Sequence, residues 1–292
     1  MKVAVYGKQF QQDVAPFVYE LFLELEKAEM EVLVYEPFYN FLSQQMHLNL
    51  FLGTYNSHEE LKKNIDLFIS IGGDGTILDA TTLIRDSEIP IIGVNTGRLG
   101  FLADVAKDQI PKTIKQLVNK RFSIDQRTLI KLETEQSLFG ELNFALNEVT
   151  ISRKDTTSMI TITTYINDQY LNSYWADGLI IATPTGSTGY SLSCGGPIVM
   201  PGSENFIITP VAPHNLNVRP LVISDKYEIK VKVEGRAKQF LVALDSRIQT
   251  MDAGLELIIK KESFKINMIE TETQDFSSTL RNKLLWGLDK RN

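Results

Sequence analysis

The first hundred residues alternate between short apolar runs and stretches with helical spacing. Lys2 to Tyr6, Glu31 to Tyr35 and Ile89 to Asn95 are typical of buried strands, and the apolar positions between residues 14 and 25 fall on one helical face. This order of strand, helix and strand predicts a parallel, doubly wound sheet with right-handed crossovers. The aromatic segment from Phe38 to Gly53 shows no clear period, and we interpret it as a mobile connection.

From Phe122 onward the pattern becomes a series of strands. Their alternation predicts an all-β, sandwich-like second domain, with Asn167-Asp168 as the tight turn of a hairpin. The expected strands cover residues 124–133, 138–153, 159–166, 169–175, 179–183, 206–211, 227–234, 239–244, 255–260 and 264–269.

These patterns divide the chain into three parts. We expect an α/β domain over residues 1–104, a mainly β domain over 105–268, and a C-terminal segment over 269–292. Asp108 to Lys120 has helical spacing and is placed as the hinge between the two domains. Leucines at 280, 284 and 288 also repeat with helical spacing, so the last segment is expected to be a helix that returns to the first domain.

The stretch from Ile65 to Leu78 joins a buried strand to a helix through Gly72-Gly73-Asp74-Gly75. At such a junction the first N–H groups of the helix are unpaired and its dipole end is positive, and glycines let the main chain approach an anion closely. The loop is therefore a candidate phosphate site. The alternative is a simple hairpin turn, because Asp-Gly favours tight turns, but the helical spacing after Thr76 argues against it.

Asp74 needs a chemical reason to lie in an anion site, because a carboxylate repels an anionic ligand. Accepting a proton from an attacking hydroxyl is such a reason. Asp74 is therefore the candidate general base.

Five motifs in order along the chain resemble the NAD kinase family. The first is the loop just described, and the others are Asn95 to Leu102, Asn147-Glu148, Asp177-Gly178 and Thr183 to Tyr190. Lipid kinases and phosphofructokinases carry similar Gly-Gly-Asp-Gly loops, so the specific signal is the ordered set.

The resemblance implies an ATP-dependent NAD kinase that transfers the γ-phosphoryl group of ATP to the 2′-hydroxyl of the adenosine ribose of NAD, giving NADP. It implies Mg²⁺ or another divalent cation, held chiefly by the phosphates and not by a dedicated protein cage. It also implies assembly into a dimer or tetramer. The alternatives are a lipid or sugar kinase of the same superfamily and a dinucleotide sensor without turnover.

The resemblance also assigns roles to individual residues. Asp74 is the base, and Gly75 contacts the same nucleotide through its N–H group. Asn147 and Glu148 bind ribose hydroxyls and the adenine edge, whereas residue spacing alone leaves open a solvent-facing strand edge with a bulge. Asp177 binds the nicotinamide end, where spacing alone favours ordinary turn chemistry.

Further expected contacts follow the Thr183 motif. Ala212 is expected near the nicotinamide. His214 is expected to lie on the surface or to pack against neighbouring residues. The residues expected around the adenine and ribose are Thr188, Gly189, Tyr190, Ser191, Leu192 and Ser193.

Three positions depart from the family pattern. Gly189 stands where alanine is usual, and Trp175 where a basic residue is common near the dinucleotide phosphates. Asp245-Ser246 replaces the usual Asp-Gly, so no role is carried onto either residue.

Composition and charge limit the classes of binding partner and the cellular compartment that we expect for this chain. A net charge of −6 offers no basic surplus for nucleic acid, and no apolar run approaches the ~20 residues that span a bilayer. The single Cys194 cannot form an internal disulfide and is interpreted as a small buried residue, and residues 1–7 are expected to be a strand and not a signal peptide. We therefore expect a cytoplasmic protein. With three histidines and no Cys pair, a zinc site is not expected.

Overall fold

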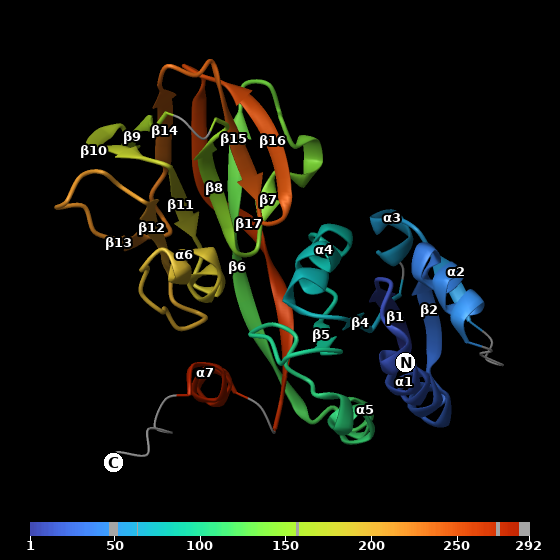
Figure 1. Cartoon of the computed structure of the whole chain (residues 1–292). Coiled ribbons are helices and arrows are strands. Elements are labelled where there is room, and N and C mark those ends of the chain that lie inside the picture. The colour runs from blue at the N-terminus through green and yellow to red at the C-terminus, as the bar shows by residue number, and fades with distance from the viewer. Residues whose placement is uncertain (47–51, 63, 156–157, 273–274, 286–292) are drawn as a thin grey trace, which may run out of the picture. The chain divides into compact units, whose positions relative to one another are not determined.

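The computed structural model describes residues 1–46, 52–62, 64–155, 158–272 and 275–285 (Figure 1). The chain forms two compact units. The first comprises Met1–Gln126 with Ile266–Asn292, and the second comprises Arg127–Lys265. The first unit is therefore built from two separate parts of the sequence.

The first unit contains a parallel sheet. Its strands lie in the order β3-β2-β1-β4-β5, and the end of β17 pairs with β5 at Met268 and Ile91. The pairs β2–β3, β1–β2, β1–β4, β4–β5 and β5–β17 are all parallel, and the core includes Val5, Leu67, Ile69 and Ile92. The bounds are β1 Lys2–Gly7, β2 Glu31–Tyr35, β3 Gly53–Tyr55, β4 Leu67–Ile71, β5 Ile91–Val94 and β17 Glu256–Thr271.

Prolines mark the start of three helices in this unit. Pro16, Pro37 and Pro111 occupy the first turns of α1, α2 and α5, where the missing N–H costs no helical hydrogen bond. The bounds are α1 Ala15–Lys27, α2 Glu36–Gln45, α3 His58–Leu61, α4 Asp74–Ile84, α5 Ile110–Val118 and α7 Phe276–Leu284.

Helix α2 corrects the interpretation of Phe38 to Gly53 as a mobile connection. Phe38 and Leu42 are buried one helical turn apart, and Phe10 and Phe41 pack against them. The flanking aromatic residues hid this short period. Residues 47–51, including His47, lie outside the described residues.

The second unit contains two antiparallel sheets. One has the order β10-β9-β14-β17 with β6 and β7 beside it, and the other has the order β13-β12-β11-β8-β15-β16. Alternate residues of both, such as Ile162, Val231, Val149 and Ile151, form one core, as in a sandwich. The bounds are β6 Phe122–Thr134, β7 Phe144–Ala145, β8 Glu148–Arg153, β9 Ile160–Ile166, β10 Gln169–Ala176, β11 Gly178–Ala182, β12 Asn205–Val211, β13 Leu221–Ser224, β14 Ile229–Glu234, β15 Gln239–Leu244 and β16 Arg247–Asp252.

Some expected strands differ in detail. Asn167 and Asp168 form a tight turn with φ of 48° and 65°, as the sequence predicts. The expected strand 138–153 is interrupted before β8, whereas 255–260 and 264–269 are one strand, β17. Strand β16 was missed because Arg247–Asp252 is mostly polar and its core residue is Met251.

The C-terminal helix is α7, and it belongs to the first unit. Asp275 and Ser278 form a capping box at its start. The ring centroids of Phe276 and Phe101 are 6.2 Å apart. Among the described residues, no helix has the length and apolar character needed to cross a bilayer.

Candidate active site

Helix α4 follows β4 along the chain (Figure 1). Asp74 is the first residue of α4, two glycines after the end of β4. The strand order of the first unit changes direction between β1 and β4, which is where doubly wound sheets bind ligands. Gly72 has φ of 150°, and a Cβ there would meet the Thr76 Oγ1 at 2.2 Å. Glycine at this position is therefore required by the turn itself.

Gly73 and Gly75 have no such internal reason to be glycine. Apart from the adjacent residues and the helix's own backbone, no heavy atom of the described residues lies within 4 Å of the position that a Cβ would occupy at either glycine. Both are exposed at the start of α4, whose first N–H groups have no acceptor within the helix. The space around them is open to a ligand that approaches the backbone, as the phosphate hypothesis requires.

The carboxylate of Asp74 is held by the loop that follows β5. Its Oδ1 accepts hydrogen bonds from the N–H groups of Leu102 at 3.0 Å and Ala103 at 2.9 Å, and its Oδ2 accepts one from Phe101 at 2.9 Å. A carboxylate oxygen can accept two hydrogen bonds, so Oδ2 keeps one acceptor position. The carboxylate is thus oriented and still able to accept a proton.

Asn95 organises this loop from its base. Its side chain donates to the carbonyls of Arg98 at 2.9 Å and Ala103 at 3.0 Å, and it accepts from the N–H of Gly97 at 2.7 Å. The motif from Asn95 to Leu102 therefore positions Asp74. The sequence shows both segments as family motifs, but it does not show this link between them.

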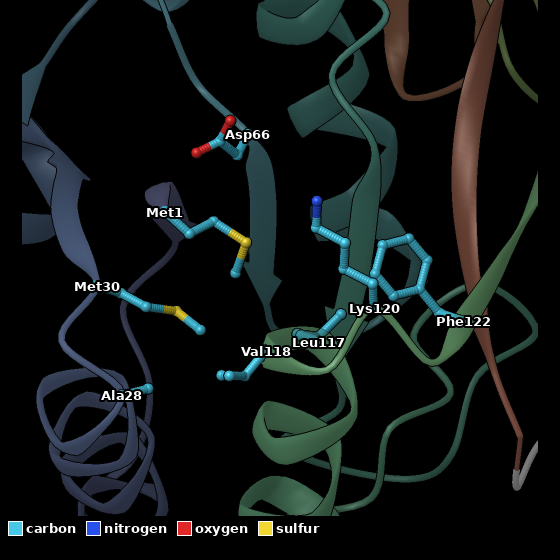
Figure 2. Close-up of a pocket in the computed structure, with 8 residues that line it drawn as sticks. All are labelled: Met1, Ala28, Met30, Asp66, Leu117, Val118, Lys120 and Phe122. Carbon is cyan, nitrogen blue, oxygen red and sulfur yellow. The ribbon is translucent and has the colours of Figure 1, made fainter.

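A cavity of about 650 Å³ in the first unit contains none of the expected site residues (Figure 2). Met1, Met30 and Asp66 line it at the starts of β1, β2 and β4, whereas Asp74 follows the end of β4. The cavity therefore lies at the amino ends of these strands, whereas Asp74 follows the carboxyl end of β4. Its other lining residues are Ala28, Leu117, Val118, Lys120 and Phe122.

In the second unit, Asn147 lies just before β8 and Glu148 is the first residue of that strand. The buried Oδ1 of Asn147 and Oε2 of Glu148 have no hydrogen-bond partner among the described residues. A buried acceptor without a donor is costly, so this pair is suited to hydroxyl or amino groups of a ligand. The solvent-facing alternative does not fit Glu148, which is 9% exposed.

Burial raises the pKa of Glu148 to about 8, and the charge of Asp245 adds to the effect. The carboxyl group therefore holds a proton at neutral pH and can both donate and accept hydrogen bonds.

The turn after β11 packs against this pair. A Cβ at Gly186 would lie 2.2 Å from the carbonyl oxygen of Asn147, so only glycine allows this approach. A Cβ at Gly189 would lie 3.3 Å from Oε2 of Glu148 and 3.5 Å from Nδ2 of Asn147. Gly189 is therefore beside the Glu148 acceptor and the amide nitrogen of Asn147.

The expected contacts from Thr188 to Ser193 differ in accessibility. Tyr190 is 45% exposed, but Ser191 is fully buried and its hydroxyl lies 2.8 Å from that of Thr209. Thr188 donates to the carbonyl of Thr185 at 3.2 Å. Leu192 is half-buried, and Ser193 is exposed. Tyr190 is thus better presented to a ligand than Ser191.

Asp177 and Ala212 lie at neighbouring strand ends. The N–H of Asp177 donates to the carbonyl of Val211 at 3.0 Å, and the Asp177 carboxylate pairs with Arg153 at 2.9 Å. Ala212 is exposed and has φ of 44°, a conformation that alanine rarely adopts. The two residues expected at the nicotinamide are thus together.

An aromatic pair lies next to them in sequence. Trp175 is 47% exposed, and its ring centroid is 4.4 Å from that of His214. The His214 N–H donates to the Trp175 carbonyl at 2.8 Å.

Within the described parts of the chain, no three His, Cys, Asp or Glu side chains are grouped so that they could hold a metal ion.

Comparisons with known proteins cover both units. Residues 8–122 match the ATP-NAD kinase N-terminal domain family, and residues 146–271 match the ATP-NAD kinase C-terminal domain family. An NAD kinase from Flavobacterium psychrophilum is 53% identical over 294 residues, with 100% of each chain covered.

Two solved structures share the fold. A yeast NADH kinase in complex with NADH has a TM-score of 0.88 at 23% identity, with 98% of this chain and 88% of that chain covered. An NAD kinase from Archaeoglobus fulgidus in complex with ATP has a TM-score of 0.74 at 28% identity, with 97% of both chains covered.

Proposed function

This chain belongs to the NAD kinase family and is an ATP-dependent NAD kinase, and we propose that Asp74 is its general base and Asn147-Glu148 its adenosine subsite. The reaction transfers the γ-phosphoryl group of ATP to the 2′-hydroxyl of the adenosine ribose of NAD. The family assignment confirms the resemblance carried by the five motifs. It favours this reaction over the lipid or sugar kinase alternative.

The observation that carries the subsite is the pair of buried acceptors without a partner, Asn147 Oδ1 and Glu148 Oε2. Ribose hydroxyls and an adenine amino group supply the donors that these atoms lack. Gly189 and Tyr190 border the same place. Asp177 and Ala212 are proposed to contact the nicotinamide end.

Asp74 acts on the hydroxyl. Its three backbone hydrogen bonds fix the carboxylate, and the remaining position on Oδ2 accepts the proton as the bond to phosphorus forms. The open backbone at Gly73 and Gly75, at the positive end of α4, is suited to the phosphate oxygens. The chain thus supplies a base and anion-binding N–H groups to one reaction.

Three further features belong to the proposal. We infer that Mg²⁺ or another divalent cation is bound by the ATP phosphates, where it neutralises charge that develops during transfer. We also propose a homo-oligomer, dimer or tetramer, and a cytoplasmic location, which a chain with a single free cysteine suits.

One assay tests the reaction. NAD and Mg-ATP are incubated with the protein, and the product is detected with an NADP-specific dehydrogenase. An NAD analogue that lacks the adenosine 2′-hydroxyl should compete with NAD and remain unphosphorylated, because the binding contacts stay while the nucleophile is gone. Phosphorylation of this analogue would overturn the proposed orientation of the dinucleotide.

A further inference from the structure

The segment that carries Asn147 and Glu148 is held by a residue almost one hundred positions away. Asp245 lies in the turn between β15 and β16, with φ of 52°. Its carboxylate accepts hydrogen bonds from three consecutive N–H groups, those of Leu146 at 2.9 Å, Asn147 at 2.8 Å and Glu148 at 3.2 Å. Its own N–H donates to the carbonyl of Glu148 at 3.1 Å.

The carbonyl groups of this segment are held as well. The Thr183 hydroxyl donates to the Leu146 carbonyl at 2.6 Å, and the Thr183 N–H donates to the Asn147 carbonyl at 2.8 Å. Arg247, next to the Asp245 turn, donates to the carbonyls of Leu142 and Phe144. Leu146 and Asn147, which lie between β7 and β8 and belong to neither strand, are thus fixed from both sides.

Ordinary turn chemistry does not account for Asp245. An aspartate that stabilises its own turn bonds to the backbone about two residues further on. Here the three donors are 99, 98 and 97 residues away in sequence. The side chain therefore serves the distant segment.

Burying the Asp245 carboxylate also costs free energy. Burial raises the pKa of Asp245, and its charge disfavours ionisation of Glu148 close by. A stable hairpin does not need a buried charge beside a second carboxyl group. Retaining one here is consistent with a role in the site.

We propose that Asp245 is a positioning residue of the adenosine subsite, which fixes the backbone of Leu146 to Glu148 so that Asn147 Oδ1 and Glu148 Oε2 meet the nucleotide. The inference rests on the proposed role of Asn147 and Glu148. Asp245 itself touches no reacting atom. Its contribution is to hold the two acceptors in place before NAD binds, which spares the ordering that binding would otherwise require.

The direct test is Asp245→Asn, with NAD binding measured by calorimetry and steady-state rates measured with NAD and ATP varied in turn. An amide keeps the shape but sets an NH₂ group against the backbone donors. We expect the Kd and KM for NAD to rise about tenfold or more, with the KM for ATP and kcat within about twofold. The matched control is Asp252→Asn on β16, an exposed carboxylate that accepts from Gln239 at 3.1 Å and should leave all constants unchanged.

A pH profile separates positioning from general loss of structure. Among the described residues, the titratable and charged groups that act on Glu148 or Asp245 include Tyr190, Cys194 and Arg247. Removing the Asp245 charge lowers the pKa of Glu148, so the midpoint of the pH dependence of NAD binding should move to lower pH in Asp245→Asn. A weaker fold alone would not move this midpoint.

A second variant decides the case if Asp245→Asn does not fold. Thr183→Val keeps the shape and removes two hydrogen bonds of the hydroxyl, the one donated to the Leu146 carbonyl and the one accepted from the Gly186 N–H. It should raise the Kd for NAD about fivefold or more. Unchanged NAD affinity in a folded Asp245→Asn, or in Thr183→Val when Asp245→Asn is unfolded, would overturn the inference.

Glu148→Ala separates this inference from the proposed function beneath it. If Glu148→Ala leaves the Kd for NAD unchanged, the adenosine subsite itself is misplaced. If Glu148→Ala weakens NAD binding while Asp245→Asn does not, only the positioning role of Asp245 fails.

Discussion

A Cβ atom on Gly100 would lie 1.8 Å from Oδ1 of Asp74. Any larger residue at position 100 must therefore displace either the carboxylate or its loop. We predict that Gly100→Ala lowers kcat by about 10² or more, because the base loses its orientation. Initial rates in the coupled NADP assay measure this effect.

Gly97→Ala is the matched control, since its Cβ would meet only Asn95 Oδ1, at 4.0 Å. It should keep kcat within about threefold of the parent, the scale of an ordinary surface change. Equal losses in both variants would show that the loop tolerates no added methyl group and that Asp74 is not the reason.

Asp74→Asn should lower kcat by about 10² or more, because an amide cannot take the proton. Its NH₂ group would also face backbone donors, so the free energy of unfolding should fall by about 1 kcal/mol. The Kd for NAD should change little. The control is Asp86→Asn, which changes an exposed carboxylate just after α4. Turnover within a few-fold of the parent would remove Asp74 from the base role.

Asn147→Ala should raise the KM for NAD by about tenfold, the effect of roughly 1–3 kcal/mol of lost hydrogen bonding. The KM for ATP should stay near its parent value, because Asn147 is assigned to the adenosine of NAD. Steady-state rates with each substrate varied in turn provide both constants. A parallel rise in the two KM values would mean that Asn147 supports the fold and not the subsite.

Glu148 should make stability depend on pH. Its pKa is raised from the ordinary value of 4.5 to about 8 in the folded chain, so its contribution to stability is complete below pH 4.5 and is lost as the pH rises toward 8. Glu148→Gln should remove this loss, which is on the order of a few kcal/mol. Urea unfolding of both proteins at pH 5 and pH 8 measures the difference. The same slope with pH in parent and variant would contradict the assignment.

The local pattern was sufficient to predict the Asp74 loop. A buried strand, three glycines around one carboxylate, and helical spacing afterwards lie within fourteen residues, and α4 begins at Asp74 itself. The hydrogen bonds that hold the Asp74 carboxylate cannot be predicted from this local pattern, because their donors are the N–H groups of Phe101 to Ala103 in another loop. Periodicity locates elements, but it does not show which backbone donors will face a side chain.

The second unit shows even more clearly that periodicity does not reveal contacts between distant segments. Asn147 was expected inside one strand over 138–153, but the ladder breaks there because Asp245 takes the N–H groups that a neighbouring strand would bind. In sequence, Asp245-Ser246 looks like a turn, and no local signal ties it to Glu148. The burial of Ser191 against Thr209 was likewise decided by packing between segments that are apart in sequence.

The first unit is interrupted by the second, because residues 127–265 are inserted between its two parts. During synthesis, β5 is made long before Met268, the β17 residue that pairs with Ile91, and before Ile269, which joins the core of the sheet. The nascent α/β half therefore waits with the Ile91 end of β5 unpaired, since Val105 pairs only with the other end. An unpaired strand edge is a site of mispairing and aggregation. The β half is continuous in sequence and has no such delay. Ribosome-bound chains should gain protease resistance first in the later-encoded half.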